Sequence, residues 1–296
     1  MTPHTSLPAV AFLGLGIMGS GMAGRLSSAG YPLAVYNRNA DRSRSLGEKG
    51  ARVADSARDA ASNADIVFSM VADDAASRAM WEGDAGALAG VRPGATLVEC
   101  STVTAGRIAE LAEAAERAGC TLVDAPVTGS KPQAAAGELT FLVGASDAAL
   151  ERIRHALAAM GKTIHHLGPT GSGALVKLIN NFLCGVQAAS LAEAMSVIER
   201  SSLDRATALN AIISGSPGSP VMKTLAARMT APDFTPNFYL HLLAKDMRYA
   251  IAEGESRGVP MRTAATALGL LDSAIAHGDG DRDMAAVVEQ FREAAR

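Results

Sequence analysis

The sequence has few of the residues on which disulfide scaffolds, metal centres and nucleic-acid-binding surfaces depend. Its three cysteines, Cys100, Cys120 and Cys184, are an odd number without the spacing of a metal site. We therefore expect no metal and a reducing, cytoplasmic compartment. The 27 basic residues are dispersed and are outnumbered by 30 acidic ones. This balance predicts no binding to nucleic acid or to an anionic membrane.

Long uncharged hydrophobic runs are also lacking. The N-terminus has no basic region followed by a cleavable apolar segment, because the first apolar run is the short stretch 10–13. The longest weakly charged stretch, 174–197, is too polar for an isolated membrane span and suits a buried helix between domains. Its polar residues are Lys177, Asn180, Asn181, Gln187 and Glu193. We expect a soluble protein.

A glycine-rich segment near the N-terminus is the most informative part of the sequence. Residues 10–13 form a continuous apolar run, typical of a strand buried on both faces, and a helical pattern follows. Between them, Gly14, Gly16 and Gly19 have the G-x-G-x-x-G spacing. The first glycine permits the tight turn, the second lets a pyrophosphate approach, and the third lets the helix pack closely. We predict a dinucleotide site that includes Leu15, Ile17 and Met18, where the helix N-terminus faces the phosphates.

The chain is long enough for two domains, and its periodicity changes once. Up to residue 168, strand-like runs alternate with helical segments, which predicts a doubly wound, helix-covered parallel sheet. From residue 174, apolar residues follow the helical i, i+3, i+4 rhythm to about residue 200, and no strand-period segment appears afterwards. We expect a Rossmann domain over 1–168 and an all-α domain over 169–296, entered through a long interdomain helix.

The end of the second predicted strand indicates which cofactor binds. An acidic residue there would accept the ribose 2′-OH of NAD, whereas an arginine accommodates the 2′-phosphate of NADP. The sequence has Asn37 and Arg38 there, with Arg42 and Arg44 shortly after. Since arginine matches phosphate geometry and a carboxylate would repel it, we predict NADP(H). The end of the next strand, at Met70 and Val71, completes this group of cofactor-binding candidates.

Two further segments have residues suited to chemistry. Lys177 and Asn181 are four residues apart, hence on one face of the long helix, just after the domain junction. Interdomain clefts are preferred ligand sites, although a lone lysine there is often a snorkelling surface residue. Thr128, Gly129 and Ser130 follow a strand end and are suited to a turn whose donors bind a carboxylate. An ordinary loop is the alternative for this segment.

Taken together, the motifs resemble those of the β-hydroxyacid dehydrogenase family, which includes 3-hydroxyisobutyrate dehydrogenases, tartronate semialdehyde reductases and glyoxylate/succinic semialdehyde reductases. They occur in the family's order over nearly the whole chain. They are Gly14–Gly19, Asn37-Arg38, Ser101-Thr102, Asp124-Ala-Pro-Val-Thr-Gly129, Gly171–Asn181 and Lys245-Asp246.

The resemblance implies a role for each matching residue. Lys177 is similar to the catalytic lysine that protonates the nascent alkoxide, and Asn181 to the asparagine that holds the substrate oxygen. Thr128, Gly129 and Ser130 match the turn that binds the substrate carboxylate. Ser101 belongs with the substrate-binding candidates, and Thr102 and Lys245 match positions near the nicotinamide.

One departure from the family pattern concerns the substrate. Many relatives have two glycines in the substrate turn, whereas this sequence has Gly129-Ser130-Lys131-Pro132, with Thr128 where serine is usual. This form resembles the glyoxylate/succinic semialdehyde reductase branch. We therefore expect an NADPH-dependent reductase of a small carboxylate-bearing carbonyl compound.

Four alternatives stay open. They are a 3-hydroxyisobutyrate-type dehydrogenase, a tartronate semialdehyde-type dehydrogenase, an imine reductase, and a non-catalytic NADP-binding module; the presence of Lys177 counts against the last two. The apolar helix and alanine-rich C-terminal half also predict a homodimer or homotetramer.

Overall fold

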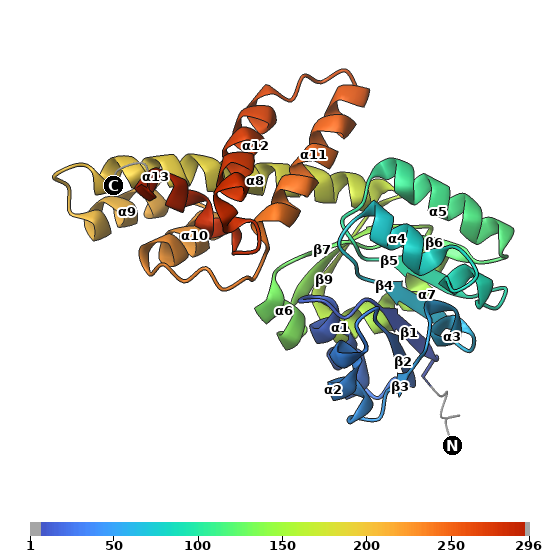
Figure 1. Ribbon diagram of the computed structural model, residues 1–296. Helices are drawn as coiled ribbons and strands as arrows, with labels where there is room; N and C mark the ends of the chain where they lie inside the picture. The colour runs from blue at the N-terminus through green and yellow to red at the C-terminus, as the bar shows by residue number, and fades with distance from the viewer. Residues whose placement is uncertain (1–6, 294–296) are drawn as a thin grey trace. The chain divides into compact units, whose positions relative to one another are not determined.

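The computed structural model describes residues 7–293. The chain divides into two compact units, Met1–Lys177 and Leu178–Arg296, and the long helix α8 (Ser172–Glu199) belongs to both. Figure 1 shows the sheet of the first unit and the helices of the second. Each unit has its own hydrophobic core.

The first unit is built on one mixed, mainly parallel sheet. Its strands lie in the order β3-β2-β1-β4-β5-β6-β8-β7, and β9 pairs with β8. The run from β3 to β6 is parallel, β6 and β7 are antiparallel to β8, and β8 and β9 are parallel. The strands are β1 (Val10–Leu13), β2 (Leu33–Tyr36), β3 (Arg52–Val53), β4 (Ile66–Ser69), β5 (Thr96–Glu99), β6 (Thr121–Asp124), β7 (Val127–Thr128), β8 (Leu139–Gly144) and β9 (Gly161–Gly168).

Helices cover both faces of this sheet, as the continuous apolar strands require. Val10 and Phe12 pack under α1 (Gly19–Ser28), α6 (Lys131–Ala136) and α7 (Asp147–Met160). Ala11 and Leu13 face the other core, with α3 (Ala57–Ala61), α4 (Asp74–Trp81) and α5 (Ala105–Arg117). The shorter segments are η1 (Ala40–Ser43), α2 (Arg44–Gly47) and η2 (Ala87–Ala89). The predicted doubly wound Rossmann architecture is confirmed.

The structure corrects the expected sheet in two ways. Antiparallel pairing at β8 was not expected, and it arises because the segment between β7 and β8 holds only the short helix α6. A parallel return needs a longer crossover. The strands β3 and β7 were also not predicted, since two residues are too few to display a hydrophobic period. The short helix α6 was not predicted either.

The second unit is helical over its described residues, as predicted. Its core gathers apolar residues from every long helix of the unit. The segments after α8 are α9 (Arg205–Ser214), α10 (Pro220–Thr230), α11 (Leu240–Ser256), α12 (Arg262–Ala274), the π-helical η3 (Ile275–Asp279), η4 (Met284–Val288) and α13 (Glu289–Glu293). Buried Asp283 links three of its segments, accepting hydrogen bonds from Arg228 and from the backbone of Asn237, Phe238 and Ala285.

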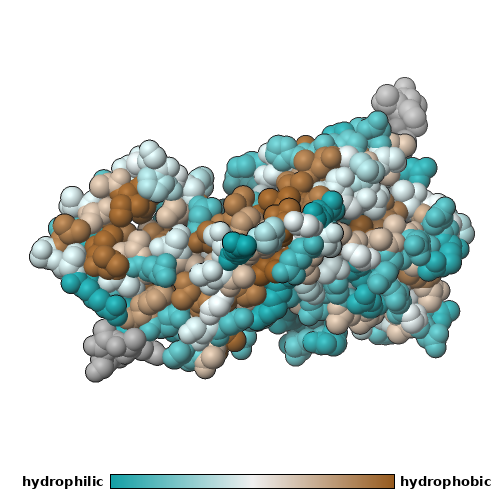
Figure 2. Space-filling model, turned by 90° about the horizontal axis from the view of Figure 1, so that it is seen from above, coloured by the Kyte–Doolittle hydropathy of each residue, from teal (hydrophilic) through white to brown (hydrophobic). Residues whose placement is uncertain are grey.

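Helix α8 has an unusually apolar surface for its length. Among the described helices it is the one long and apolar enough to cross a membrane by length and composition, a test that core helices also pass. Of its most apolar 18-residue window, 39% is buried. Ile179, Leu183 and Val197 are 47%, 49% and 70% exposed, and hydrophobic residues reach the surface of the helical unit in Figure 2.

Candidate cofactor and substrate site

The glycine-rich turn between β1 and α1 has the geometry that its spacing predicts. Gly14 has φ +90°, and a Cβ there would lie 2.3 Å from the carbonyl oxygen of Met70. A Cβ at Gly19 would lie 2.0 Å from the Gly14 oxygen. A side chain at Gly19 would force the helix away from the strand, and one at Gly14 would force the turn away from the segment that follows β4. At Gly16 a Cβ would meet only Arg42 Nη1, at 3.8 Å, so the surface beside this residue is open.

The same turn leaves backbone donors available for a ligand. Within residues 7–293, the N–H groups of Gly16, Ile17 and Met18 donate no hydrogen bond. Leu15 differs, since its residue is 1% exposed and its N–H donates to Asn37 Oδ1 at 2.8 Å. Free N–H groups at a helix N-terminus bind phosphate, so these residues fit the pyrophosphate of a dinucleotide.

Some side chains at the end of β2 are already hydrogen-bonded or ion-paired within the protein, and others can bind a ligand. Asn37 accepts from Leu15 and donates to the Asn39 carbonyl, so it connects β2 to the glycine turn. Arg44 is paired with Asp41 at 2.6 Å. Arg38 and Arg42 are exposed and form no ion pair within the described part of the chain. Two guanidinium groups are therefore available beside an open glycine.

The loops that follow β4 and β5 are joined by a buried serine. Ser101 Oγ accepts the N–H of Val71 at 2.8 Å, and Ser101 is 1% exposed. This burial assigns Ser101 to holding the loop, while its direct contact with a substrate stays a prediction. Met70, Val71 and Thr102 are half-buried at the carboxyl edge of the sheet, which is where doubly wound folds bind ligands.

The predicted carboxylate turn also caps a helix. Gly129 has φ +109° and is exposed, and Thr128 and Ser130 are half-buried. Ser130 begins α6, and both its N–H (3.0 Å) and its hydroxyl (2.8 Å) donate to Gln133 Oε1. Our sequence interpretation missed Gln133, although Ser-x-x-Gln before a helix is the pattern of a capping box. An incoming carboxylate must therefore compete with Gln133 for the donors of Ser130.

Asp124 connects the strand before this turn to the beginning of α8. Its Oδ1 accepts the N–H of Gly171 at 2.6 Å and its Oδ2 accepts that of Ala174 at 2.8 Å. Glycine at 144 and 173 makes the contact possible, since a Cβ at these positions would lie 2.4 and 2.9 Å from the carboxylate oxygens. Burial raises the pKa of Asp124 to about 6, although the donating N–H groups lower it in part.

The predicted catalytic residues lie along α8, and one of them has an unpredicted partner. Lys177 is half-buried in the first turns of the helix. Asn181 is 2% exposed and donates from Nδ2 to Asp246 Oδ2 at 2.5 Å. Its Oδ1 accepts from Asn180 at 2.9 Å. Lys245 lies 2.8 Å from the other oxygen of Asp246, so Asp246 orients the amide of Asn181.

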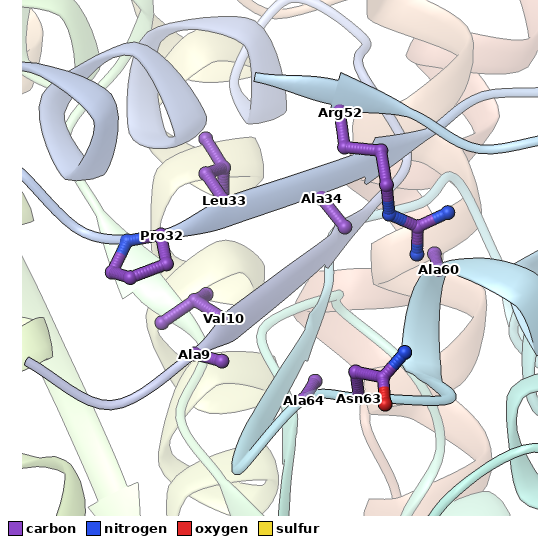
Figure 3. A pocket seen from close by; sticks show the side chains of 9 residues that line it. All are labelled: Ala9, Val10, Pro32, Leu33, Ala34, Arg52, Ala60, Asn63 and Ala64. Carbon is purple, nitrogen blue, oxygen red and sulfur yellow. The ribbon is translucent and has the colours of Figure 1, made fainter. Parts of the chain in front are cut away.

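A small pocket lies in the first unit, at the opposite end of β1 from the glycine turn. It has a volume of about 180 Å³ and is lined mainly by small and apolar side chains at the amino ends of β1 and β2 (Figure 3). Its guanidinium group, from Arg52, is held by Asp59 at 2.8 Å. The pocket contains none of the predicted site residues, and doubly wound folds bind ligands at the carboxyl ends instead.

Comparisons with known proteins agree with this geometry. A family model described as the NAD binding domain of 6-phosphogluconate dehydrogenase matches residues 9–168, and one described as NAD-binding of NADP-dependent 3-hydroxyisobutyrate dehydrogenase matches residues 171–291. The chain is 35% identical over 292 residues to an NAD-dependent L-serine dehydrogenase of Pseudomonas aeruginosa, covering 95% of this chain and 97% of that one.

Two solved structures share the fold over nearly the whole chain. A 3-hydroxyisobutyrate dehydrogenase from Salmonella typhimurium has a TM-score of 0.87 at 29% identity, covering 96% of this chain and 99% of that one. A Mycobacterium tuberculosis 3-hydroxyisobutyrate dehydrogenase with L-serine has a TM-score of 0.87 at 28% identity, covering 97% and 99%.

The fold and the glycine turn thus define a pyridine-nucleotide-dependent oxidoreductase that acts on CH–OH groups. Within that class, the chain belongs to the β-hydroxyacid dehydrogenase family and is similar to its 3-hydroxyisobutyrate dehydrogenases. The family resemblance seen in the sequence motifs is confirmed.

Asp124 generates a prediction about stability and pH. Its pKa is raised on folding, so between pH 3.8 and about 6 the folded protein binds more protons than the unfolded chain. Its contribution to stability is complete below pH 3.8 and is lost as the pH rises through 6. Asp124→Asn removes this titration. The free energy of unfolding of the variant, relative to wild type, should therefore rise by about 3 kcal/mol between pH 3.5 and 7.

Urea denaturation across this pH range measures the difference. The variant also loses an acceptor for one N–H group, which lowers its stability by the same amount at every pH. Asp84→Asn, at an exposed carboxylate, controls for net charge. A difference between Asp124→Asn and wild type that does not vary with pH would contradict the assignment.

Proposed function

We propose that the protein is an NADPH-dependent reductase of small carbonyl acids, such as glyoxylate or succinic semialdehyde. The observation that supports this most directly is the placement of Lys177 on α8. The first turn of α8 is bonded through Asp124 to the strand that leads into the Thr128–Ser130 turn. A proton donor and anion-binding groups are thus connected to one rigid scaffold.

The residues at the glycine turn fit a bound dinucleotide. The free N–H groups of Gly16, Ile17 and Met18 suit the pyrophosphate, and the open surface at Gly16 allows its approach. When bound, the reduced nicotinamide supplies the hydride. The protein's part is to place the carbonyl carbon, through donors at 128–130, and to protonate its oxygen from Lys177 Nζ as charge develops there. The amide of Asn181, oriented by Asp246, would hold the same oxygen.

A second candidate is an NAD-dependent dehydrogenase working on a 3-hydroxy acid. The relative from Pseudomonas aeruginosa is named an NAD-dependent L-serine dehydrogenase, and one similar structure contains L-serine. The two candidates share Lys177 and the carboxylate turn, and differ in the cofactor and in the length of the acid. The end of β2 supports the NADPH-dependent candidate, because this chain has arginines and no carboxylate at that position.

We also propose that the protein is cytoplasmic and forms a homodimer or homotetramer. The support for assembly is the exposed apolar surface of Ile179, Leu183 and Val197 on α8. Sedimentation of the purified protein distinguishes such an assembly from a 30.3 kDa monomer.

The arginines predict the cofactor preference. Arg38→Ala and Arg42→Ala should each remove a charge-assisted contact with the 2′-phosphate, weakening NADPH binding by about 1.5–3 kcal/mol and leaving NADH binding unchanged. Arg44→Ala is the matched control, because Arg44 is paired with Asp41. Fluorescence titration with both cofactors measures the dissociation constants. NADPH binding that is equally strong in wild type and both variants would contradict the preference, as would tighter binding of NADH by wild type.

Lys177 should act on the rate and not on cofactor binding. Removal of a general acid lowers turnover about 10²–10⁴-fold, so Lys177→Ala should lose kcat while the NADPH dissociation constant stays within a few-fold. Lys177→Arg keeps the positive charge but cannot release a proton near neutral pH. If Lys177 donates the proton, Lys177→Arg should be as slow as Lys177→Ala. Near-normal turnover in Lys177→Arg would show that charge alone is needed.

The carboxylate turn predicts poor reduction of esters. An ester lacks the negative charge with which a carboxylate competes with Gln133 for the donors of Ser130, so kcat/KM for the methyl ester of succinic semialdehyde should be about 10–100-fold below that of the acid. Thr128→Val should reduce kcat/KM for the acid and have little effect on the ester. Equal rates for acid and ester would contradict the carboxylate site, and activity on cyclic imines alone would contradict the reaction class.

A further inference from the structure

A fully buried carboxylate lies behind the loops that follow β4 and β5. Glu99, the last residue of β5, is 0% exposed. Its Oε2 accepts from Ser77 Oγ and from Trp81 Nε1, both at 2.8 Å, and its Oε1 accepts the backbone N–H of Ser101 at 3.0 Å. Both oxygens therefore act as acceptors. A carboxylate can accept at both oxygens, whereas an amide would present a donor to at least one of these three groups.

The hydrogen bond between Glu99 and Ser101 fixes the position of Ser101 at the carboxyl edge of the sheet. The hydroxyl of the same serine accepts the N–H of Val71, in the loop after β4. On the far side of Thr102, Thr104 donates from its N–H (3.0 Å) and its hydroxyl (2.7 Å) to the carboxylate of Asp74. The segment after β5 is thus bonded at two points, one on each side of Thr102: to the loop after β4 at Val71 and to the first residue of α4 at Asp74.

Glu99 is connected to a cation without touching it. Arg107, 1% exposed, donates from Nε to Ser77 Oγ at 3.1 Å, and Ser77 donates onward to Glu99. Arg107 is also paired with Glu82, whose side chain is partly exposed. A buried charge is costly unless it is hydrogen-bonded and compensated. This arrangement satisfies both conditions while leaving Glu99 Oε1 for Ser101.

We propose that Glu99 is a positioning residue for the nicotinamide end of the cofactor. Through Ser101 it fixes Val71, a predicted cofactor-binding residue, and holds the chain next to Thr102, which the family resemblance places near the nicotinamide. It makes no contact with the ligand itself. The inference rests on the proposed function, because it needs a dinucleotide in the site. It adds that the buried carboxylate at the end of β5, and not only the glycine turn, determines the position of the nicotinamide half of the cofactor.

The test separates the two halves of the cofactor. Glu99→Gln keeps the size of the side chain but cannot accept at both positions. It should weaken NADPH about tenfold, the equivalent of one hydrogen bond, and lower kcat. Binding of 2′,5′-ADP, which has the adenine-side phosphates and no nicotinamide, should not change. Arg38→Ala should instead weaken the binding of both 2′,5′-ADP and NADPH, because both ligands have the 2′-phosphate.

The single tryptophan of the chain reports on the same group. Trp81 donates to Glu99, so its emission should shift in Glu99→Gln. Ser101→Ala removes the contact with Val71 and leaves the indole bond intact. It should weaken NADPH as Glu99→Gln does, without a shift in emission, and it provides the test if Glu99→Gln does not fold. Glu116→Gln, at an exposed carboxylate on α5, is the matched control and should match wild type.

The outcomes separate this inference from the function on which it rests. Unchanged NADPH binding and turnover in Glu99→Gln and Ser101→Ala would overturn the inference alone. Equal weakening of NADPH and 2′,5′-ADP would also overturn it, since that pattern shows a general loss of structure. A wild-type protein that binds no dinucleotide would overturn the proposed function, and this inference with it.

Discussion

The close approach of β1 and α1 is the constraint on which the first unit depends. The approach requires a position without a side chain, because a Cβ at Gly19 would lie 2.0 Å from the Gly14 oxygen; a Cβ at Gly14 would in turn lie 2.3 Å from the Met70 oxygen, after β4. The same condition extends along α1 to Gly21, where a Cβ would lie 2.9 Å from the backbone of Ala134 and Ala135 in α6. Gly19 and Gly21 lie on different sides of α1 and let it approach both β1, which leads into the phosphate-binding turn, and α6, which Ser130 of the substrate turn caps.

Buried carboxylates also hold segments at the site by accepting hydrogen bonds from them. Glu99, Asp124 and Asp246 each end or occupy an element at the site and each satisfies donors from another segment. Asp124 accepts two backbone N–H groups at the start of α8, and Asp246 accepts from Asn181 within the helical unit. A charged acceptor makes stronger hydrogen bonds than a neutral one, and in a low dielectric it loses much if they are broken. Such groups therefore hold loops that apolar packing does not reach.

The main elements could be predicted from the sequence because the hydrophobic period of a strand or helix and the position of a glycine are visible within a few residues. The alternation of Val10, Ala11, Phe12 and Leu13 between two cores follows from the two-residue period of a strand, so a continuous apolar run was enough to predict a strand covered on both faces. The roles of Gly14 and Gly19 were also predicted, since backbone strain depends on the residue itself. By contrast, β3 and β7 obtain their structure from pairing with neighbours, and two residues carry no period.

For the site, the sequence by itself determined which kinds of residue are present: free amides at a helix start, arginines after β2, and a lysine and an asparagine four residues apart. Only the tertiary structure decided which of them are already engaged. Asn37 holds Leu15, Ser101 is buried against Val71, and Asn181 is bonded to Asp246. Side-chain partners that are distant in sequence leave no local pattern, because a hydrogen bond depends on distance and direction in space and not on spacing along the chain.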